Sequence, residues 1–128
     1  MPSERTRIST GSDFEKTMGY SRAIVQGDWC FVSGVTGYDY ATMQMPTSVA
    51  DQARNCFETI KKVLGEGGFE MADIARVQYT IVSAKMVADV RPVLEAYLGE
   101  IRPAATMVVA GLIEAEMLIE IEVTAFRG

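Results

Sequence analysis

The sequence contains no histidine in its 128 residues. This absence excludes serine–histidine and cysteine–histidine triads, histidine general bases and the usual zinc and iron sites. We therefore expect no metal and no cofactor. Any chemistry must use carboxylates, tyrosines, arginines, cysteines or backbone groups.

Cysteine is scarce as well, because Cys30 and Cys56 are the two in the chain and their spacing is not that of a disulfide or metal pair. Cys30 lies in the apolar stretch WCFV, and Cys56 lies in a stretch with helical periodicity. A free cysteine in such surroundings behaves as a small hydrophobic residue. We predict two buried free thiols with no catalytic role.

Positive charge is in deficit, since 12 lysines and arginines face 17 acidic residues and the net charge is −5. Nucleic-acid binding needs a basic surface, so we do not expect it. The chain also lacks an apolar run of about 18 residues, the minimum for a membrane span. No charged-then-apolar leader opens the sequence. We expect a cytoplasmic protein that binds neither nucleic acid nor membrane.

Hydrophobic residues are abundant, at 48% of the chain. The length fits one domain, residues 1–128, in which the polar residues 1–12 are expected to be loosely ordered. So apolar a composition in so small a domain indicates that part of its surface is buried between subunits.

Local patterns predict five strands and two helices. Strands are expected at residues 22–26, 29–33, 72–83, 106–110 and 117–126, with a loop at 35–46. The first helix begins at a Thr47 or Ser48 cap and ends at Gly65. The second helix is predicted to use Asp89 as its N-cap, which places Pro92 in the first turn.

Both predicted helices are amphipathic along one stripe, which is typical of helices that cover one face of a sheet. The fold class is therefore α+β. We expect the other face of the sheet to be buried against identical subunits.

The last strand contains the stretch MLIEIEVTA at residues 117–125. With a period of two, its aliphatic residues fall on one face, while Glu120 and Glu122 fall on the other. Either water or a polar site must cover these carboxylates.

Three segments together resemble the Rid family, also called the YjgF, reactive intermediate deaminase or endoribonuclease L-PSP family. They are GYSRA at residues 19–23, FVSGVTG at 31–37, and RPAATMVVAGL followed by IEIEVTA at 102–125. The resemblance implies a chorismate-mutase-like mixed sheet with two helices packed on one face. It also implies a homotrimer with ligand sites between subunits, and hydrolysis of enamines and imines such as 2-aminoacrylate to 2-keto acids and ammonia.

The resemblance also implies roles for individual residues. Glu120 matches the catalytic glutamate that positions water, Tyr20 matches the aromatic residue that closes the cleft, and Ser33 and Gly34 match the Ser-Gly turn. Ala105 stands where active members carry the arginine that binds the substrate carboxylate. Arg22 is therefore a candidate replacement cation, although a surface ion pair is the simpler interpretation of this residue.

Arg91 and Arg102 are two further candidate cations, and for both we favour pairing with an acidic neighbour. Three functions follow. The first is a Rid-type trimer that binds or converts a small metabolite, such as a carboxylic or keto acid, but hydrolyses 2-aminoacrylate inefficiently. The second is a weak imine deaminase, a hydrolase that uses another arginine. The third is a non-catalytic trimer that senses a metabolite or binds a partner protein.

Overall fold

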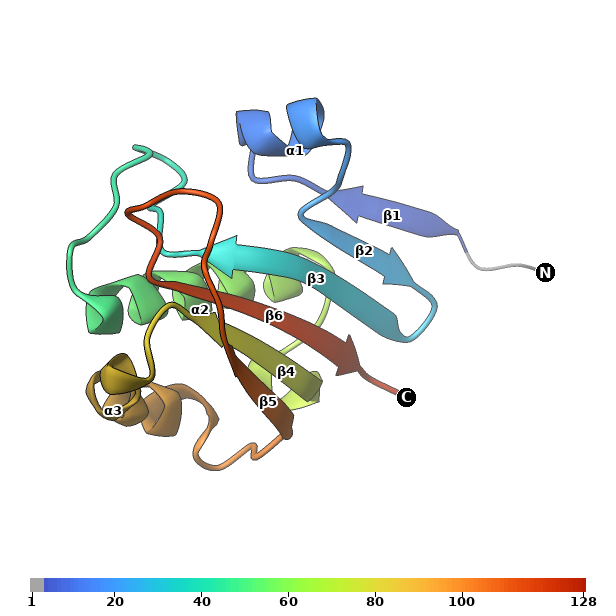
Figure 1. The fold of residues 1–128 in the computed structure, drawn as a ribbon. Helices are drawn as coiled ribbons and strands as arrows, with labels where there is room; N and C mark the ends of the chain where they lie inside the picture. Colours follow the sequence, from blue (N-terminus) through green and yellow to red (C-terminus); the bar gives the residue numbers. More distant parts are fainter. Residues whose placement is uncertain (1–3) are drawn as a thin grey trace.

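The structure is a computed structural model that describes residues 4–128. One mixed sheet has the strand order β1-β2-β3-β6-β4-β5, and two helices pack on one of its faces (Figure 1). β4 and β5 are parallel, and the other neighbouring strands are antiparallel. The strands are β1 Arg5–Ile8, β2 Ala23–Gln26, β3 Trp29–Thr36, β4 Ile74–Ile81, β5 Ala104–Val109 and β6 Ile119–Phe126, and the α-helices are α1 Asp13–Met18, α2 Val49–Glu66 and α3 Val87–Leu98.

α2 forms for the reasons that its sequence predicts. The Ser48 hydroxyl accepts a hydrogen bond from the Asp51 backbone N–H at 3.1 Å and caps the helix. The helix ends at Glu66, one residue later than expected, with Gly67 as its C-cap. Its apolar stripe is fully buried against the sheet: Ala53, Cys56, Phe57, Ile60, Val63 and Leu64.

The prediction for the start of α3 was wrong. The helix begins at Val87, so Asp89 lies inside its first turn rather than at the cap, and Pro92 lies within the helix. The physical reason is a preceding 3-10 turn, Ala84–Met86, whose cap Ser83 accepts from the Lys85 N–H at 3.3 Å. This turn leads directly into α3, so the helix begins earlier than the sequence indicated.

Two N-terminal elements were missed. β1 lies within residues 1–12, which we expected to be loosely ordered, and its four residues pair with β2. Residues 1–3 of that stretch lie outside the described part of the chain. α1 has Ser12 as its N-cap and Gly19 as its C-cap, and Gly19 has a φ of +73°, which favours glycine.

β3 is longer than predicted, because it continues past residue 33 to Thr36. Its pairing with β6 shifts register between Val32 and Val35. This irregularity adds one residue to β3 that has no partner on β6. It therefore places Ser33 and Gly34 at a distortion in the sheet.

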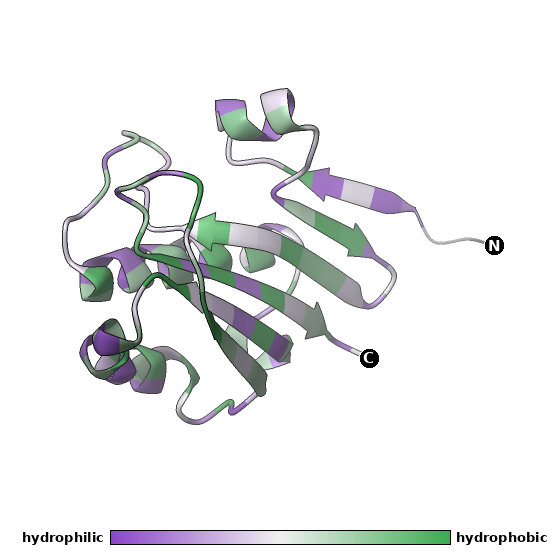
Figure 2. Ribbon diagram, in the orientation of Figure 1, coloured by the Kyte–Doolittle hydropathy of each residue, from purple (hydrophilic) through white to green (hydrophobic). Residues whose placement is uncertain are grey.

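The hydrophobic core lies between the sheet and helices α2 and α3. In β6, Ile119, Ile121 and Val123 are buried on the helix side, while Glu120 and Glu122 face the other way. Figure 2 shows this alternation as bands along the strand. These features confirm the α+β class and the chorismate-mutase-like sheet.

The sheet face away from α2 and α3 carries exposed aromatic residues. Trp29 is 43% exposed, Phe31 is 47% exposed and Phe126 is 41% exposed. The Trp29 ring lies 6.0 Å from Phe31 and 4.5 Å from Phe126, between ring centroids.

Among residues 4–128, no helix is long and apolar enough to cross a membrane.

Both thiols are buried in the fold, and burial raises the pKa of Cys30 and Cys56. We expect labelling of native protein by a disulfide reagent to be at least about 100-fold slower than labelling of unfolded protein. The variant Lys61→Cys, at an exposed position of α2, is the control and should react at once. Rapid labelling of a native cysteine would contradict the prediction and reopen a nucleophilic mechanism.

Candidate functional site

A cavity of about 350 Å³ opens on the sheet face away from α2 and α3. Its walls come from α1, the segment between α1 and β2, the end of β3 and the loop that follows it, the β5–β6 connection and the start of β6. All five predicted site residues line this cavity: Tyr20, Arg22, Ser33, Gly34 and Glu120. The remaining lining residues are Phe14, Met18, Thr36, Tyr40, Ile113 and Met117.

Among the described residues that line the cavity, Arg22 is the one with a positive charge. It is buried rather than exposed. Its side chain is 1% exposed, so the surface ion pair that we favoured is wrong. Nη1 donates to the Gly34 carbonyl at 2.7 Å and to the Ser33 hydroxyl at 3.1 Å. The guanidinium therefore holds the distorted part of β3 against the start of β2.

The other side of the Arg22 guanidinium faces Glu15 of α1. Arg22 Nε lies 3.9 Å from Glu15 Oε2 and has no hydrogen-bond partner among the described residues. The same carboxylate oxygen accepts from the Thr10 hydroxyl at 2.5 Å and the Thr10 N–H at 3.1 Å. Burial opposes ionisation of Glu15, but hydrogen bonds from Thr10 and Ser9 and the charge of Arg22 lower its pKa overall. Glu15 is therefore ionised at neutral pH.

Two tyrosine rings lie near the guanidinium. Arg22 Cζ is 5.7 Å from the Tyr20 ring centroid and 5.2 Å from that of Tyr40. Such distances fit cation–π contacts. The Tyr40 hydroxyl in turn lies 3.4 Å from Thr36 Oγ1. The rings thus shield the cation from solvent and fix its orientation.

Glu120 lies against the backbone of β3, and Gly34 makes this possible. A Cβ at position 34 would stand 2.5 Å from Glu120 Cδ, so no other residue leaves the carboxylate where it is. Burial and the neighbouring charge of Glu122 raise the pKa of Glu120, although Arg22 opposes the shift. A carboxyl group with a raised pKa is suited to general acid–base chemistry.

The β5–β6 connection is held over the cavity by contacts on both sides. The Tyr38 hydroxyl lies 2.5 Å from Glu114 Oε1 and 2.6 Å from Glu116 Oε1. The buried Gln52 amide donates to the Glu116 carbonyl and accepts from the Leu118 N–H, both at 2.9 Å. These contacts position the cavity-lining residues of the connection.

The remaining candidate cations lie elsewhere. Arg91 and Arg102 are exposed and do not line the cavity. Neither pairs with a carboxylate within residues 4–128, so the pairing that we favoured is not seen. Ala105 is exposed on the edge strand β5, outside the cavity of its own chain.

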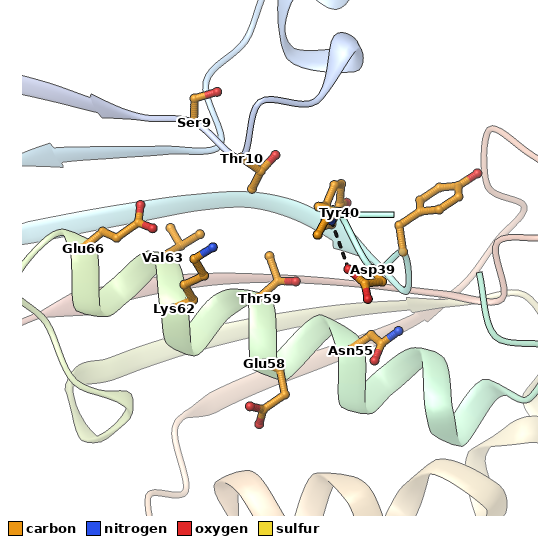
Figure 3. A pocket seen from close by; sticks show the side chains of 12 residues that line it. Ser9, Thr10, Asp39, Tyr40, Asn55, Glu58, Thr59, Lys62, Val63 and Glu66 are labelled. Carbon is orange, nitrogen blue, oxygen red and sulfur yellow. Dashed lines mark hydrogen bonds between the residues drawn. The ribbon is translucent and has the colours of Figure 1, made fainter. Parts of the chain in front are cut away.

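A second cavity of about 410 Å³ lies along the exposed side of α2. Figure 3 shows Thr59, Lys62 and Glu66 along the helix, below Ser9 and Thr10, while Glu58 points away. Tyr40 lines both cavities. None of the residues that we predicted for the site lies in this second cavity.

Two residues near Arg22 had no signal in the sequence: Tyr40, which lines the first cavity, and Glu15, which lies beside the guanidinium outside the lining. Glu15 lies in a polar segment without periodicity, and Tyr40 lies in a stretch expected to be a loop. Only the fold brings them to Arg22. Within the described residues, no group of three or more histidine, cysteine or acidic side chains could hold a metal ion. The cavity is therefore lined by the carboxyl group of Glu120, by a guanidinium whose charge is balanced by Glu15, by tyrosine rings and by apolar side chains.

Sequence and structure comparisons agree on the family. Residues 10–127 match the family model described as Endoribonuclease L-PSP. The chain belongs to this family, the Rid or YjgF family.

Relatives of known name share about a quarter to a third of their residues with this Rid protein. It is 30% identical to a RutC family protein of Pyrococcus horikoshii, over 84% of this chain and 86% of the relative. It is 26% identical to 2-iminobutanoate/2-iminopropanoate deaminase of Escherichia coli, over 84% of this chain and 87% of the relative. A crystal structure of a YjgF/YER057c/UK114 family member from Mycobacterium tuberculosis matches with a TM-score of 0.89 and 34% identity, over 97% of this chain and all (100%) of the other.

The environment of Glu120 predicts a pH-dependent gain of stability in Glu120→Gln. Because the pKa of Glu120 is raised in the folded protein, its contribution to the free energy of unfolding is fully present below the ordinary pKa of 4.5. This contribution is lost as the pH rises through the pKa of the folded state. Glutamine avoids this loss. We expect a higher urea midpoint than wild type at pH 7 and a smaller difference near pH 4.

The control for this measurement is Glu100→Gln, which removes the same charge at an exposed position and should change the midpoint little at either pH. A Glu120→Gln variant that is less stable than wild type at pH 7 would show that the buried carboxylate is stabilised by contacts other than those described.

Proposed function

We propose that this protein is a cytoplasmic homotrimer with small-molecule sites at its subunit interfaces. Each site binds or hydrolyses a small imine, enamine or related carbonyl compound other than 2-aminoacrylate. The observation that carries the proposal is the meeting of the five predicted residues in one cavity. The name of the Escherichia coli relative, an imine deaminase, supports the reaction class.

Glu120 is the group in the cavity that can move a proton. Water adds to the carbon of a C=N bond, and a carboxyl group beside that carbon can take a proton from the water and return one to the departing nitrogen. Burial and the charge of Glu122 raise the pKa of this carboxyl group, which makes it a stronger proton acceptor than an ordinary glutamate. Gly34 serves the same chemistry by leaving room for the carboxyl group.

Ala105 supports the exclusion of 2-aminoacrylate. The resemblance places an arginine at this position in active members, where it binds the substrate carboxylate. A charge-assisted bidentate contact of that kind is worth about 1.5–3 kcal/mol, and alanine provides none of it. Efficient turnover of this small carboxylate is therefore not expected.

The open sheet face supports the trimer. Trp29, Phe31 and Phe126 form an exposed aromatic cluster on it, and an exposed apolar patch of this kind is typical of a protein–protein interface. A ribonuclease function has less support, because the chain has a net charge of −5 and no histidine for acid–base cleavage of RNA.

The assembly can be tested by sedimentation equilibrium at micromolar concentration. We expect a mass about three times the 14.0 kDa of the chain, because burial of the aromatic face favours association. Phe31→Lys, which places a charge in that face, should weaken assembly, whereas Lys61→Glu on the exposed side of α2 should not. A clean monomer would remove the basis for sites between subunits.

The reaction can be tested with a dehydratase that releases 2-aminoacrylate from serine, by following pyruvate formation. We expect little acceleration by wild type. Ala105→Arg should gain about 10- to 100-fold in kcat/KM by restoring the contact to the carboxylate. The double variant Ala105→Arg/Glu120→Ala should lose this gain.

Ala88→Arg is the matched control, because it makes the same alanine-to-arginine change at an exposed position of α3, away from the open sheet face. It should leave the rate unchanged. High wild-type activity would contradict the proposed exclusion of 2-aminoacrylate. Binding of carbonyl compounds without turnover of any imine would instead favour a non-catalytic metabolite sensor.

A further inference from the structure

We propose that the cavity selects uncharged or cationic imines that lack a carboxylate, together with their carbonyl products, because Glu15 neutralises Arg22. This inference rests on the function proposed above and names its substrate class. It departs from the expectation of a carboxylic or keto acid ligand.

The first argument is the balance of charge. Arg22 contributes one positive charge, and Glu15, 3.9 Å from it, contributes one negative charge. Both side chains are buried, at 1% and 5% exposed, so water screens their interaction weakly. Glu120 adds a second carboxyl group. The described cavity therefore has no net positive charge to attract a carboxylate, and it favours a protonated C=N group when Glu120 is ionised.

The second argument is the geometry of the guanidinium. A carboxylate is best bound by two parallel N–H donors of an arginine. In Arg22, Nη1 is already bonded to the Gly34 carbonyl and the Ser33 hydroxyl, and Nε faces Glu15. The rings of Tyr20 and Tyr40 lie near the same group. A carboxylate that used Nη1 would compete with the contacts that hold β3 in place, and one that used Nε would meet the negative charge of Glu15.

The third argument is the rest of the wall. Phe14 and Met18 of α1, and Ile113 and Met117 of the β5–β6 connection, are the apolar residues that face the cavity. They suit a hydrocarbon substituent. No lysine and no second arginine lines the cavity among the described residues.

The reaction that these groups support balances without another reactant. A water oxygen forms a bond to the imine carbon while Glu120 accepts one proton from that water. The C–N bond then breaks, and the nitrogen leaves as ammonia after it takes up protons from Glu120 and the added hydroxyl group. One imine and one water thus give one ketone or aldehyde and one ammonia, with no change of oxidation state.

The test compares two carbonyl probes with the same hydrocarbon part, 4-methylpentan-2-one and 4-methyl-2-oxopentanoate. Each is titrated into the intact protein and followed by changes in the amide NMR signals of Gly34 and Glu120. We expect wild type to bind the uncharged ketone at least 10-fold more tightly than the keto acid. The variant Glu15→Gln keeps an acceptor for Thr10 but removes the compensating charge, and it should shift this preference at least 10-fold toward the keto acid.

Asp13→Asn is the matched control. It removes the same charge from the same helix at an exposed position, and it should keep the wild-type preference. If Glu15→Gln does not fold, the wild-type preference decides alone. Wild-type binding of the keto acid as tightly as the ketone would overturn the inference while leaving a functional site. Absence of any response at Gly34 and Glu120 to either probe would overturn the proposed function as well.

Discussion

The buried guanidinium of Arg22 is the interaction on which the site depends. It joins three elements that are separate in the sequence: the start of β2, the distorted end of β3 and the short helix α1. Removal of one partner of a buried ion pair leaves an uncompensated charge, which costs about 3–5 kcal/mol. The geometry of Gly34, and through it the place of Glu120, is therefore tied to a contact that lies outside the helix-packed core.

The division of the sheet into two faces explains why the same sequence can be stable and functional. Aliphatic residues on one face of β6 pack against α2, and they fix the register of the whole strand. A one-residue slip would bury both glutamates, so the register is strongly specified. Glu120 reaches the cavity because the hydrophobic residues beside it cannot move.

Much of this could be predicted from the sequence, and the failures have physical causes. The alternation around Glu120 and the apolar stripe of α2 identified their buried faces correctly, since periodicity reports burial directly. The cap of α3 was misplaced because Ser83 starts a 3-10 turn that no hydrophobic pattern marks. The register shift in β3 depends on pairing with β6, a strand more than eighty residues away in the sequence. Glu15 could not be linked to Arg22, because their meeting follows from the turn at Gly19 and not from any spacing.

The aromatic cluster on the open sheet face has a spectroscopic consequence. Trp29 is the single tryptophan of the chain, and it stands at 4.5 Å from Phe126 with 43% of its surface exposed. Its fluorescence emission therefore arises from one known position on that face. Emission at long wavelength reports indole in contact with water, and a shift to shorter wavelength reports that protein has covered it. The emission wavelength of Trp29 therefore reports whether the open sheet face is covered by another protein surface.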